Sequence, residues 1–225
     1  MNFNWQSILI TLPGILLGLT VHEYCHALAA YKLGDQTARE MGRLTFNPLK
    51  HIDLIGFLFI IIAGFGWAKP VQFNPENLRH FRRDKAIIAA AGPLSNLVLA
   101  VILSALVWGW WAGLTYVPAG KADLIYSIFY NRPFFVFIIV LERAIMINLG
   151  LFVFNLFPIP PLDGSHILFS GLNLRPETER TIMRIGGPLL FILIIIQNRT
   201  NLNILPIGKL VNAMMNLLLP QLRGG

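Results

Sequence analysis

Five long apolar stretches constrain the fold of this chain more than any other feature of its sequence. About 20 apolar residues in a row can cross the hydrocarbon core of a bilayer as a helix, which pairs its own backbone polar groups. Apolar residues make up 55% of the 225 positions and charged residues only 13%. We therefore predict an all-α polytopic membrane protein. The stretches lie at about 8–31, 86–114, 134–157, 182–196 and 202–219, the last two being short or tilted.

A sixth apolar stretch, residues 52–65, is only 14 residues long, which suits a re-entrant segment better than a span. If it crossed the bilayer, one of the two basic clusters beside it would lie outside, against the positive-inside rule. We therefore favour a segment that enters and returns on the cytoplasmic side, with a crossing as the alternative. The two clusters are Lys32, Arg39, Arg43 and Lys50 before it, and Lys69, Arg79, Arg82, Arg83 and Lys85 after it.

The basic charge does not indicate nucleic-acid binding. The formal net charge is +7, but the basic residues lie in short runs beside apolar segments, as in membrane proteins. The first 21 residues contain no Lys or Arg, so we expect no cleavable signal peptide. No stretch is long enough for a separate soluble domain. We predict one membrane-embedded domain over residues 1–225, with a core at about 8–168 and a C-terminal helical hairpin at about 182–219.

The first apolar stretch contains an H-E-x-x-H motif formed by His22, Glu23 and His26. Positions i and i+4 share one face of a helix, so both imidazoles can bind one Zn²⁺ while Glu23 reaches a water on the metal. Ionisable groups in hydrocarbon cost roughly 2.5 to 3.5 kcal/mol each, and a metal would offset that cost. Cys25, the single cysteine, points about 100° away from either histidine and is not expected to be a ligand.

A catalytic zinc usually has three protein ligands and one open position, so the two histidines need a partner. Asp163 is the best candidate, because it follows the apolar stretch 134–157 where three prolines must break the helix. Broken backbone at membrane depth requires a protein-lined, wet cavity. With a re-entrant segment 52–65, Asp163 returns to the depth of His22 and His26. The alternative is that Asp163 only caps the helix after Gly164.

Three separated motifs resemble those of the site-2 proteases, which are intramembrane zinc metalloproteases. The run from His22 to His26 resembles the zinc helix of that family, Ala90 to Asn96 its A-G-P-x-x-N helix, and Asn155 to Gly164 its N-x-x-P…L-D-G motif. The resemblance covers about residues 16–168. Residues 42–53 and 66–71 look like the compact bacterial subgroup that lacks PDZ and CBS modules. Only about twenty residues, 113–133, stand where larger members carry a PDZ module.

The resemblance implies that His22, His26 and Asp163 bind one Zn²⁺ per chain and that Glu23 activates the zinc-bound water. Asn155 is implied to hold the substrate backbone or to stabilise the oxyanion, although it could simply pair broken backbone carbonyls. Residues 66–73 occupy the place of a β-structured loop that presents the substrate as an extended strand. The implied activity is hydrolysis of peptide bonds in the transmembrane segments of protein substrates. The implied location is a bacterial cytoplasmic membrane, with the active site toward the cytoplasm.

Other functions fit the sequence less well. A catalytically silent regulator of the same fold that binds membrane helices is the main alternative, and the intact Glu23 and Asp163 argue against it. A metal transporter would place ionisable residues along several helices. The remaining histidines are weaker candidates: we expect His51 and His80 at the interface. His166 follows the L-D-G motif by three residues and could face the metal, but a fourth protein ligand would close the water position. Asn96 is expected to join helices through a hydrogen bond, and Gly92 with Pro93 to allow a kink or close helix approach.

Overall fold

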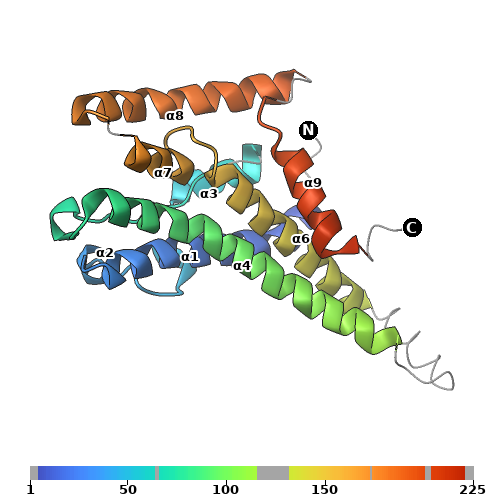
Figure 1. Cartoon of the computed structure of the whole chain (residues 1–225). Coiled ribbons are helices and arrows are strands. Elements are labelled where there is room, and N and C mark those ends of the chain that lie inside the picture. The colour runs from blue at the N-terminus through green and yellow to red at the C-terminus, as the bar shows by residue number, and fades with distance from the viewer. Residues whose placement is uncertain (1–4, 64–65, 116–131, 173, 201–203, 221–225) are drawn as a thin grey trace.

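The computed structural model describes residues 5–63, 66–115, 132–172, 174–200 and 204–220. Three of its helices are long and apolar enough to cross a membrane: α1 (Trp5–Lys32), α4 (Phe81–Thr115) and α6 (Arg132–Asn155). They correspond to the first three predicted stretches and confirm the all-α polytopic membrane fold. Figure 1 shows them packed against one another, with α7 and α8 above them in this view. Most of the connection expected to lack a PDZ module, 116–131, lies outside the described residues.

Small residues let α1 approach its neighbours closely. A Cβ added at Gly14 would lie 2.7 Å from the Cα of Ala144 on α6, and one added at Gly18 would lie 3.0 Å from Oδ1 of Asn148. Helices in lipid gain little from the hydrophobic effect between them, so close backbone contact and buried polar pairs are what hold them together. These close contacts between α1 and α6 therefore lie about one and two turns before the H-E-x-x-H motif.

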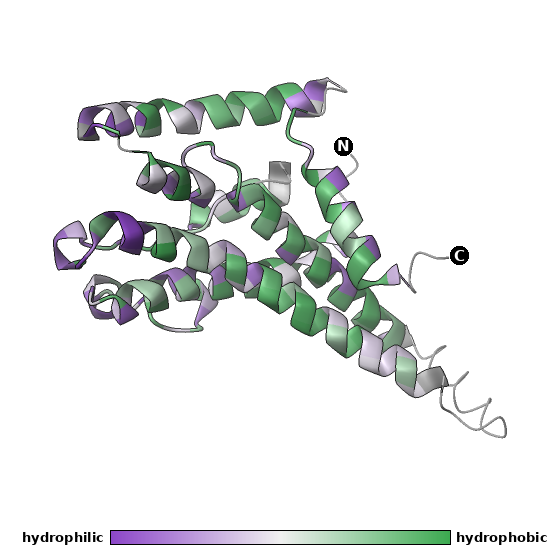
Figure 2. Ribbon diagram, in the orientation of Figure 1, coloured by the Kyte–Doolittle hydropathy of each residue, from purple (hydrophilic) through white to green (hydrophobic). Residues whose placement is uncertain are grey.

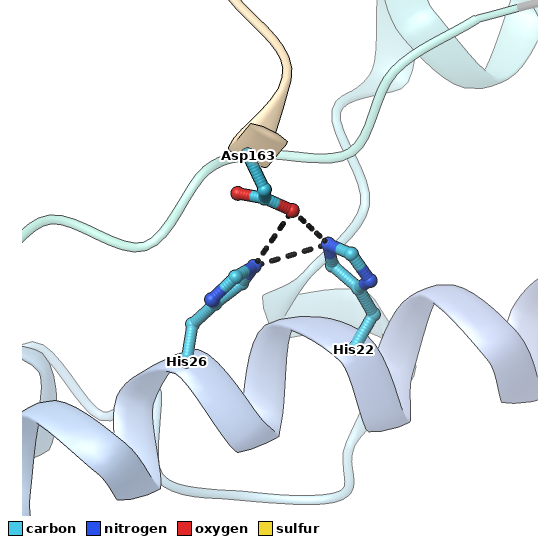
Figure 3. A group of neighbouring side chains, drawn as sticks. All are labelled: His22, His26 and Asp163. Carbon is cyan, nitrogen blue, oxygen red and sulfur yellow. Dashed lines mark hydrogen bonds and ion pairs between the residues drawn. The ribbon is translucent and has the colours of Figure 1, made fainter. Parts of the chain in front are cut away.

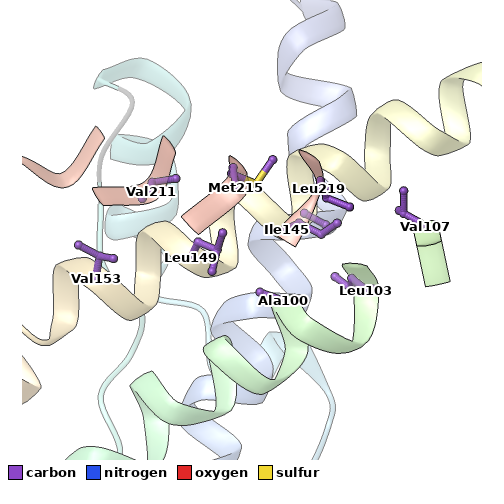
Figure 4. Close-up of a cluster of buried hydrophobic side chains, with 10 residues drawn as sticks. Ala100, Leu103, Val107, Ile145, Leu149, Val153, Val211, Met215 and Leu219 are labelled. Carbon is purple, nitrogen blue, oxygen red and sulfur yellow. The ribbon is translucent and has the colours of Figure 1, made fainter. Parts of the chain in front are cut away.

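A buried apolar cluster joins α4, α6 and α9 (Ile207–Leu218), as Figure 4 shows. Val211, Met215 and Leu219 pack onto the face of α6 that carries Leu149 and Val153. The predicted C-terminal hairpin, 182–219, is thus present as two successive helices, α8 (Pro176–Arg199) and α9, but α9 packs on α6 and not along α8. At 12 residues, about 18 Å, α9 is too short to span a bilayer.

The segment predicted to be re-entrant contains a single helix, α3 (Leu54–Ala63), whose 10 residues measure about 15 Å, half the hydrocarbon thickness. Its two flanks meet, because Ile52 and Ala68 form an antiparallel bridge and Lys69 N donates to His51 O at 2.8 Å. A Cβ added at Gly56 would lie 2.1 Å from Trp67 O, so glycine permits this return. The geometry agrees with the re-entrant prediction. Among the described residues, the expected β-structure is limited to this one bridge.

Polar residues gather where α1 ends and α4 begins, at the hydrophilic end of the ribbon in Figure 2. The short helices α2 (Thr37–Glu40), η1 (Pro48–Lys50) and η2 (Pro75–Asn77) lie in these connections. The buried Asp35 carboxylate joins two of them, accepting hydrogen bonds from Thr37 N and Oγ1, from Asn74 N and from Asn77 Nδ2. Burial alone would raise the pKa of Asp35, but these hydrogen bonds outweigh it and lower the pKa.

The proline segment after α6 places Asp163. Helix α6 ends at Asn155, three residues before Pro158, as the sequence predicts. The chain then turns back and begins α7 (Asp163–Gly171), with Asp163 in its first turn. Gly164 is required here, because a Cβ would lie 2.3 Å from Leu156 O. Helix α7 packs against α4, so the start of α7 lies over the centre of the three-helix layer.

Candidate metal centre

The structure brings together the three side chains that the sequence selects as metal ligands. His22 and His26 project from one face of α1, and Asp163 faces them from the start of α7 (Figure 3). Asp163 Oδ2 lies 3.2 Å from His22 Nε2 and 3.4 Å from His26 Nε2. The two Nε2 atoms are 3.0 Å apart. Within the described chain, these residues form the cluster of His, Cys, Asp or Glu that could hold a metal ion.

The outer hydrogen bonds of the two imidazoles fix their tautomers. His26 Nδ1 lies 2.7 Å from the carbonyl oxygen of Ile88, which can only accept, so Nδ1 carries the proton. His22 Nδ1 lies 2.7 Å from Asn96 Oδ1, and Asn96 Nδ2 is already a donor to Gly18 O and Asn148 Oδ1. His22 Nδ1 is therefore the donor as well. Both Nε2 atoms are left with a lone pair directed at the centre.

In the neutral tautomers that these hydrogen bonds select, two imidazole lone pairs and a carboxylate oxygen converge on one point. Asp163 Oδ2 is buried and accepts no hydrogen bond in the described structure. Three electron-pair donors at this separation repel one another unless a cation lies between them. An N₂O donor set suits Zn²⁺, and histidine ligands that donate their other N–H to a carbonyl or amide oxygen are typical of zinc sites. The residues present fit a zinc ion.

A relay of two buried asparagines orients His22. Asn148 on α6 donates to Ala144 O in its own helix at 2.8 Å, which turns its Oδ1 toward Asn96 on α4. Asn96 then has its own Oδ1 available for His22. Both asparagines are fully buried. Asn96 joins α4 to α1 and α6, as predicted, and it also orients an imidazole, which the prediction did not include.

Gly92 explains why α4 carries an A-G-P sequence at this depth. A Cβ at Gly92 would lie 2.3 Å from His26 Nε2 and 2.7 Å from His22 Cε1. Contacts of real Cβ atoms are ordinarily 3.4–4 Å. The predicted close helix approach is therefore confirmed, and the partner of that approach is the metal centre itself.

Glu23 lies beside the centre with its carboxylate held from the opposite side. Its Oε2 accepts a hydrogen bond from Val71 N at 3.0 Å and lies 3.9 Å from Nη2 of the buried Arg43. Glu23, the three centre residues and residues 66–73 line one cavity of about 410 Å³. Apolar side chains such as Leu19, Leu151 and Phe154 form much of its wall.

The other predicted residues lie at the edge of the centre. Asn155 lines the cavity, and its Nδ2 donates to Leu151 O at 3.0 Å, so part of its amide is used within α6. His166 also lines the cavity, and burial together with the nearby Lys85 charge lowers its pKa. Cys25 is a partly buried free thiol outside the cluster.

The interfacial prediction for His51 is wrong, because its side chain is fully buried. His51 Nε2 bonds to Thr45 O at 2.7 Å, which folds the connection after α2 beneath the active site. Sequence reasoning also missed Asn148 and Arg43. The signal for Asn148 was its amide within a strongly apolar stretch, where a polar side chain must have a partner. Arg43 had no such signal, because it lies in a basic connection.

Comparisons with known proteins agree with this geometry. Residues 10–196 match the model described as "Peptidase family M50". The chain is 39% identical over 157 residues to "Putative zinc metalloprotease YwhC" of Bacillus subtilis, covering 68% of this chain and 65% of that protein. It is 31% identical over 179 residues to "Putative zinc metalloprotease Rip2" of Mycolicibacterium smegmatis, covering 77% and 61%. The matches thus span slightly less than two thirds of these relatives. No solved structure matches the chain significantly.

Proposed function

The chain belongs to peptidase family M50, the site-2 proteases, and from this premise we propose that it is an intramembrane zinc metalloendopeptidase. It cleaves peptide bonds in the transmembrane segments of other proteins. The observation on which this rests is the convergence of the two Nε2 atoms and Asp163 Oδ2 beside the Glu23 carboxylate, in one cavity lined by helices long and apolar enough to cross a membrane. The names of its relatives, zinc metalloproteases, point the same way.

In this proposal, His22, His26 and Asp163 are the zinc ligands. When bound, zinc supplies Lewis acidity, which lowers the pKa of water toward about 7 and polarises the scissile carbonyl. Glu23 accepts the proton of the attacking water and delivers it to the leaving amine nitrogen. The Asn96–Asn148 relay and Ile88 O hold the imidazoles in the tautomer that this arrangement requires.

The cavity suits a peptide in extended form. Residues 66–73 run beside the centre without helix and are paired only at the bridge of Ala68 with Ile52 among the described residues, and Val71 N donates a hydrogen bond to the Glu23 carboxylate. A substrate helix must unwind before water can reach its carbonyls, and an extended backbone edge can pair with the unwound strand. Asn155 lines the cavity, and its Nδ2 donates one hydrogen bond to Leu151 O. In the described structure, its second amide hydrogen and its Oδ1 are available to contact that strand.

We infer that the active site opens toward the cytoplasm of a bacterial cell. His26 lies within two turns of the end of α1 and His22 within three, and the basic residues around the re-entrant segment cluster at that same end. The positive-inside rule assigns such clusters to the cytoplasmic face. The reaction thus takes place within the lipid bilayer, and water reaches the metal centre from the cytoplasmic face.

The test is cleavage of a fluorescent single-span substrate panel by protein reconstituted in liposomes, comparing wild type with Glu23→Gln. The exchange keeps the shape and the zinc ligands but removes the proton acceptor. We expect the wild type to cleave and the variant to retain one zinc per chain with cleavage reduced by about 10²-fold or more. Equal activity of the two proteins would exclude the role of Glu23. Binding of the panel without cleavage by either would favour the silent regulator.

A further inference from the structure

We propose that Arg43 is the positioning residue of Glu23, and that it couples the proton acceptor to the extended segment at residues 69–71. The inference rests on the proposed function, because it assigns a task within that reaction. Arg43 lies outside the three motifs of the metal centre, in the connection between α2 and η1. It acts through Glu23 and does not touch the metal ligands.

The contacts of Arg43 all point at the catalytic side of the molecule. Its side chain is 4% exposed, and its Nη2 both donates to Lys69 O and lies 3.9 Å from Glu23 Oε2. The neighbouring Val71 N donates to the same Glu23 oxygen. Nη2 of Arg43 therefore contacts both the Glu23 carboxylate and the backbone oxygen of Lys69. Lys69 lies two residues before Val71, which is the other partner of Glu23. Moving Arg43 would displace both.

The charge of Arg43 is also tied to Glu23. Within the described part of the chain, Glu23 is the carboxylate that lies within 4 Å of this guanidinium. Burial lowers the pKa of Arg43 and Glu23 opposes that shift. Leaving one partner of a buried pair alone is strongly destabilising. Each of the two therefore holds the other in place.

One nitrogen of the Arg43 guanidinium makes its contacts with the active site. Nη2 contacts Lys69 O and Glu23 Oε2, whereas Nε and Nη1 have no hydrogen-bond partner among the described residues.

The local backbone conformation positions the Arg43 side chain. Gly42 adopts φ +66°, a left-handed conformation that glycine allows, and Arg43 N then bonds back to Ala38 O at 2.9 Å. Below it, His51 is fixed by Thr45 O on its side chain and by Lys69 N on its backbone oxygen. Burial lowers the pKa of His51, which favours its neutral form. These bonds join the loop at residues 43–51 to the extended segment at residues 69–71, beside the Arg43–Glu23 pair.

The test compares Arg43→Met and Arg43→Lys with a matched control, Arg39→Met, whose side chain is exposed and hydrogen-bonds only locally to Gln36. A misplaced reacting group costs up to about 10²-fold, so Arg43→Met should lower kcat about 10- to 100-fold. KM should stay within about threefold, since substrate binding is not removed. Zinc should remain at one per chain. The Arg43→Lys side chain reaches only one of the two partners at a time, so its kcat should lie between those of the wild type and Arg43→Met. The kcat of Arg39→Met should match that of the wild type.

A double-mutant cycle measured by thermal unfolding tests the Arg43–Glu23 contact independently of enzyme activity. Arg43→Met should lower Tm clearly in the wild type, where it strands Glu23, and less in a Glu23→Gln background. Equal Tm losses in both backgrounds, or an Arg43→Met enzyme with wild-type kcat, would overturn the inference. A wild type that cleaves nothing while the cycle still shows coupling would refute the proposed function alone. If Arg43→Met does not accumulate, Arg43→Lys is judged by the same two readouts.

Discussion

Replacing Gly92 by alanine adds one methyl group at the point where α4 meets the metal centre. That Cβ would lie 2.3 Å from His26 Nε2, 2.6 Å from His26 Cε1 and 2.7 Å from His22 Cε1. Ordinary contact begins at 3.4 Å, so either the imidazoles or the helix must move by about 1 Å. Ligand distances in metal sites hold to about 0.2 Å. A shift of this size therefore breaks the coordination geometry even where the fold accommodates it.

We expect Gly92→Ala to weaken zinc binding by at least about 100-fold, the upper end of what losing a ligand-orienting partner costs. The overpacking itself should destabilise the fold by about 1–3 kcal/mol. The assay is the zinc content of detergent-purified protein by elemental analysis, with cleavage of the substrate panel measured on the same samples. Thermal unfolding of the same samples separates loss of metal from loss of fold.

Gly109→Ala is the matched control, because Gly109 lies on the same helix and a Cβ there meets nothing within 4 Å. It should bind zinc and cleave as the wild type does. A Gly92→Ala protein with one zinc per chain and full activity would refute the reasoning, since it would mean that the imidazoles do not occupy the positions described here. Equal losses from both variants would instead point to helix packing as the cause.

Three further outcomes follow from the same contacts. Asn96→Leu should retain the fold but bind zinc about 10- to 100-fold more weakly, measured by competition with a chelating dye, because His22 loses the acceptor that fixes its tautomer. Removing zinc with a chelator should lower the Tm of the wild type. The loss of stability should be about 4 kcal/mol when the free zinc concentration before removal is 1,000 times its Kd, and Asp163→Ala should show no such shift in Tm. The folded pKa of Asp35 lies below its unfolded value, so its stabilisation is complete above about pH 5 and is lost as pH falls through the folded value. Asp35→Asn should therefore cost about 1.5–3 kcal/mol at pH 7 and progressively less as the pH falls below about 4, and a cost that stays constant on acidification would contradict this account.

Local patterns in the sequence predict most of the fold and the centre. The i, i+4 spacing places His22 and His26 on one helix face whatever surrounds them, and the prolines that follow Asn155 end α6. The distribution of basic residues then predicts a re-entrant segment, and with it the depth at which Asp163 returns. The bridge between Ile52 and Ala68 and the 3.2 Å approach of Asp163 to His22 agree with that chain of reasoning.

Features that depend on distant contacts could not be predicted in this way. A buried asparagine such as Asn148 must have a partner, but its sequence does not indicate which helix supplies it. The packing of α9 on α6 depends on side chains that interdigitate across more than 50 residues of chain. Arg43 and His51 lie in a polar connection, where exposed side chains are the usual expectation, and only the return of residues 66–73 buries them.

X-ray absorption at the zinc edge of the purified wild-type protein tests the central claim most directly. The account predicts two imidazole nitrogens at about 2.0–2.1 Å and light oxygen ligands at about 2.0–2.2 Å, with one oxygen contributed by Asp163 and lost in Asp163→Ala. A sulfur ligand at about 2.3 Å would identify Cys25 as a ligand and contradict the account. A third imidazole would identify His166 in place of Asp163, and protein that binds no zinc at all would refute the metal centre itself.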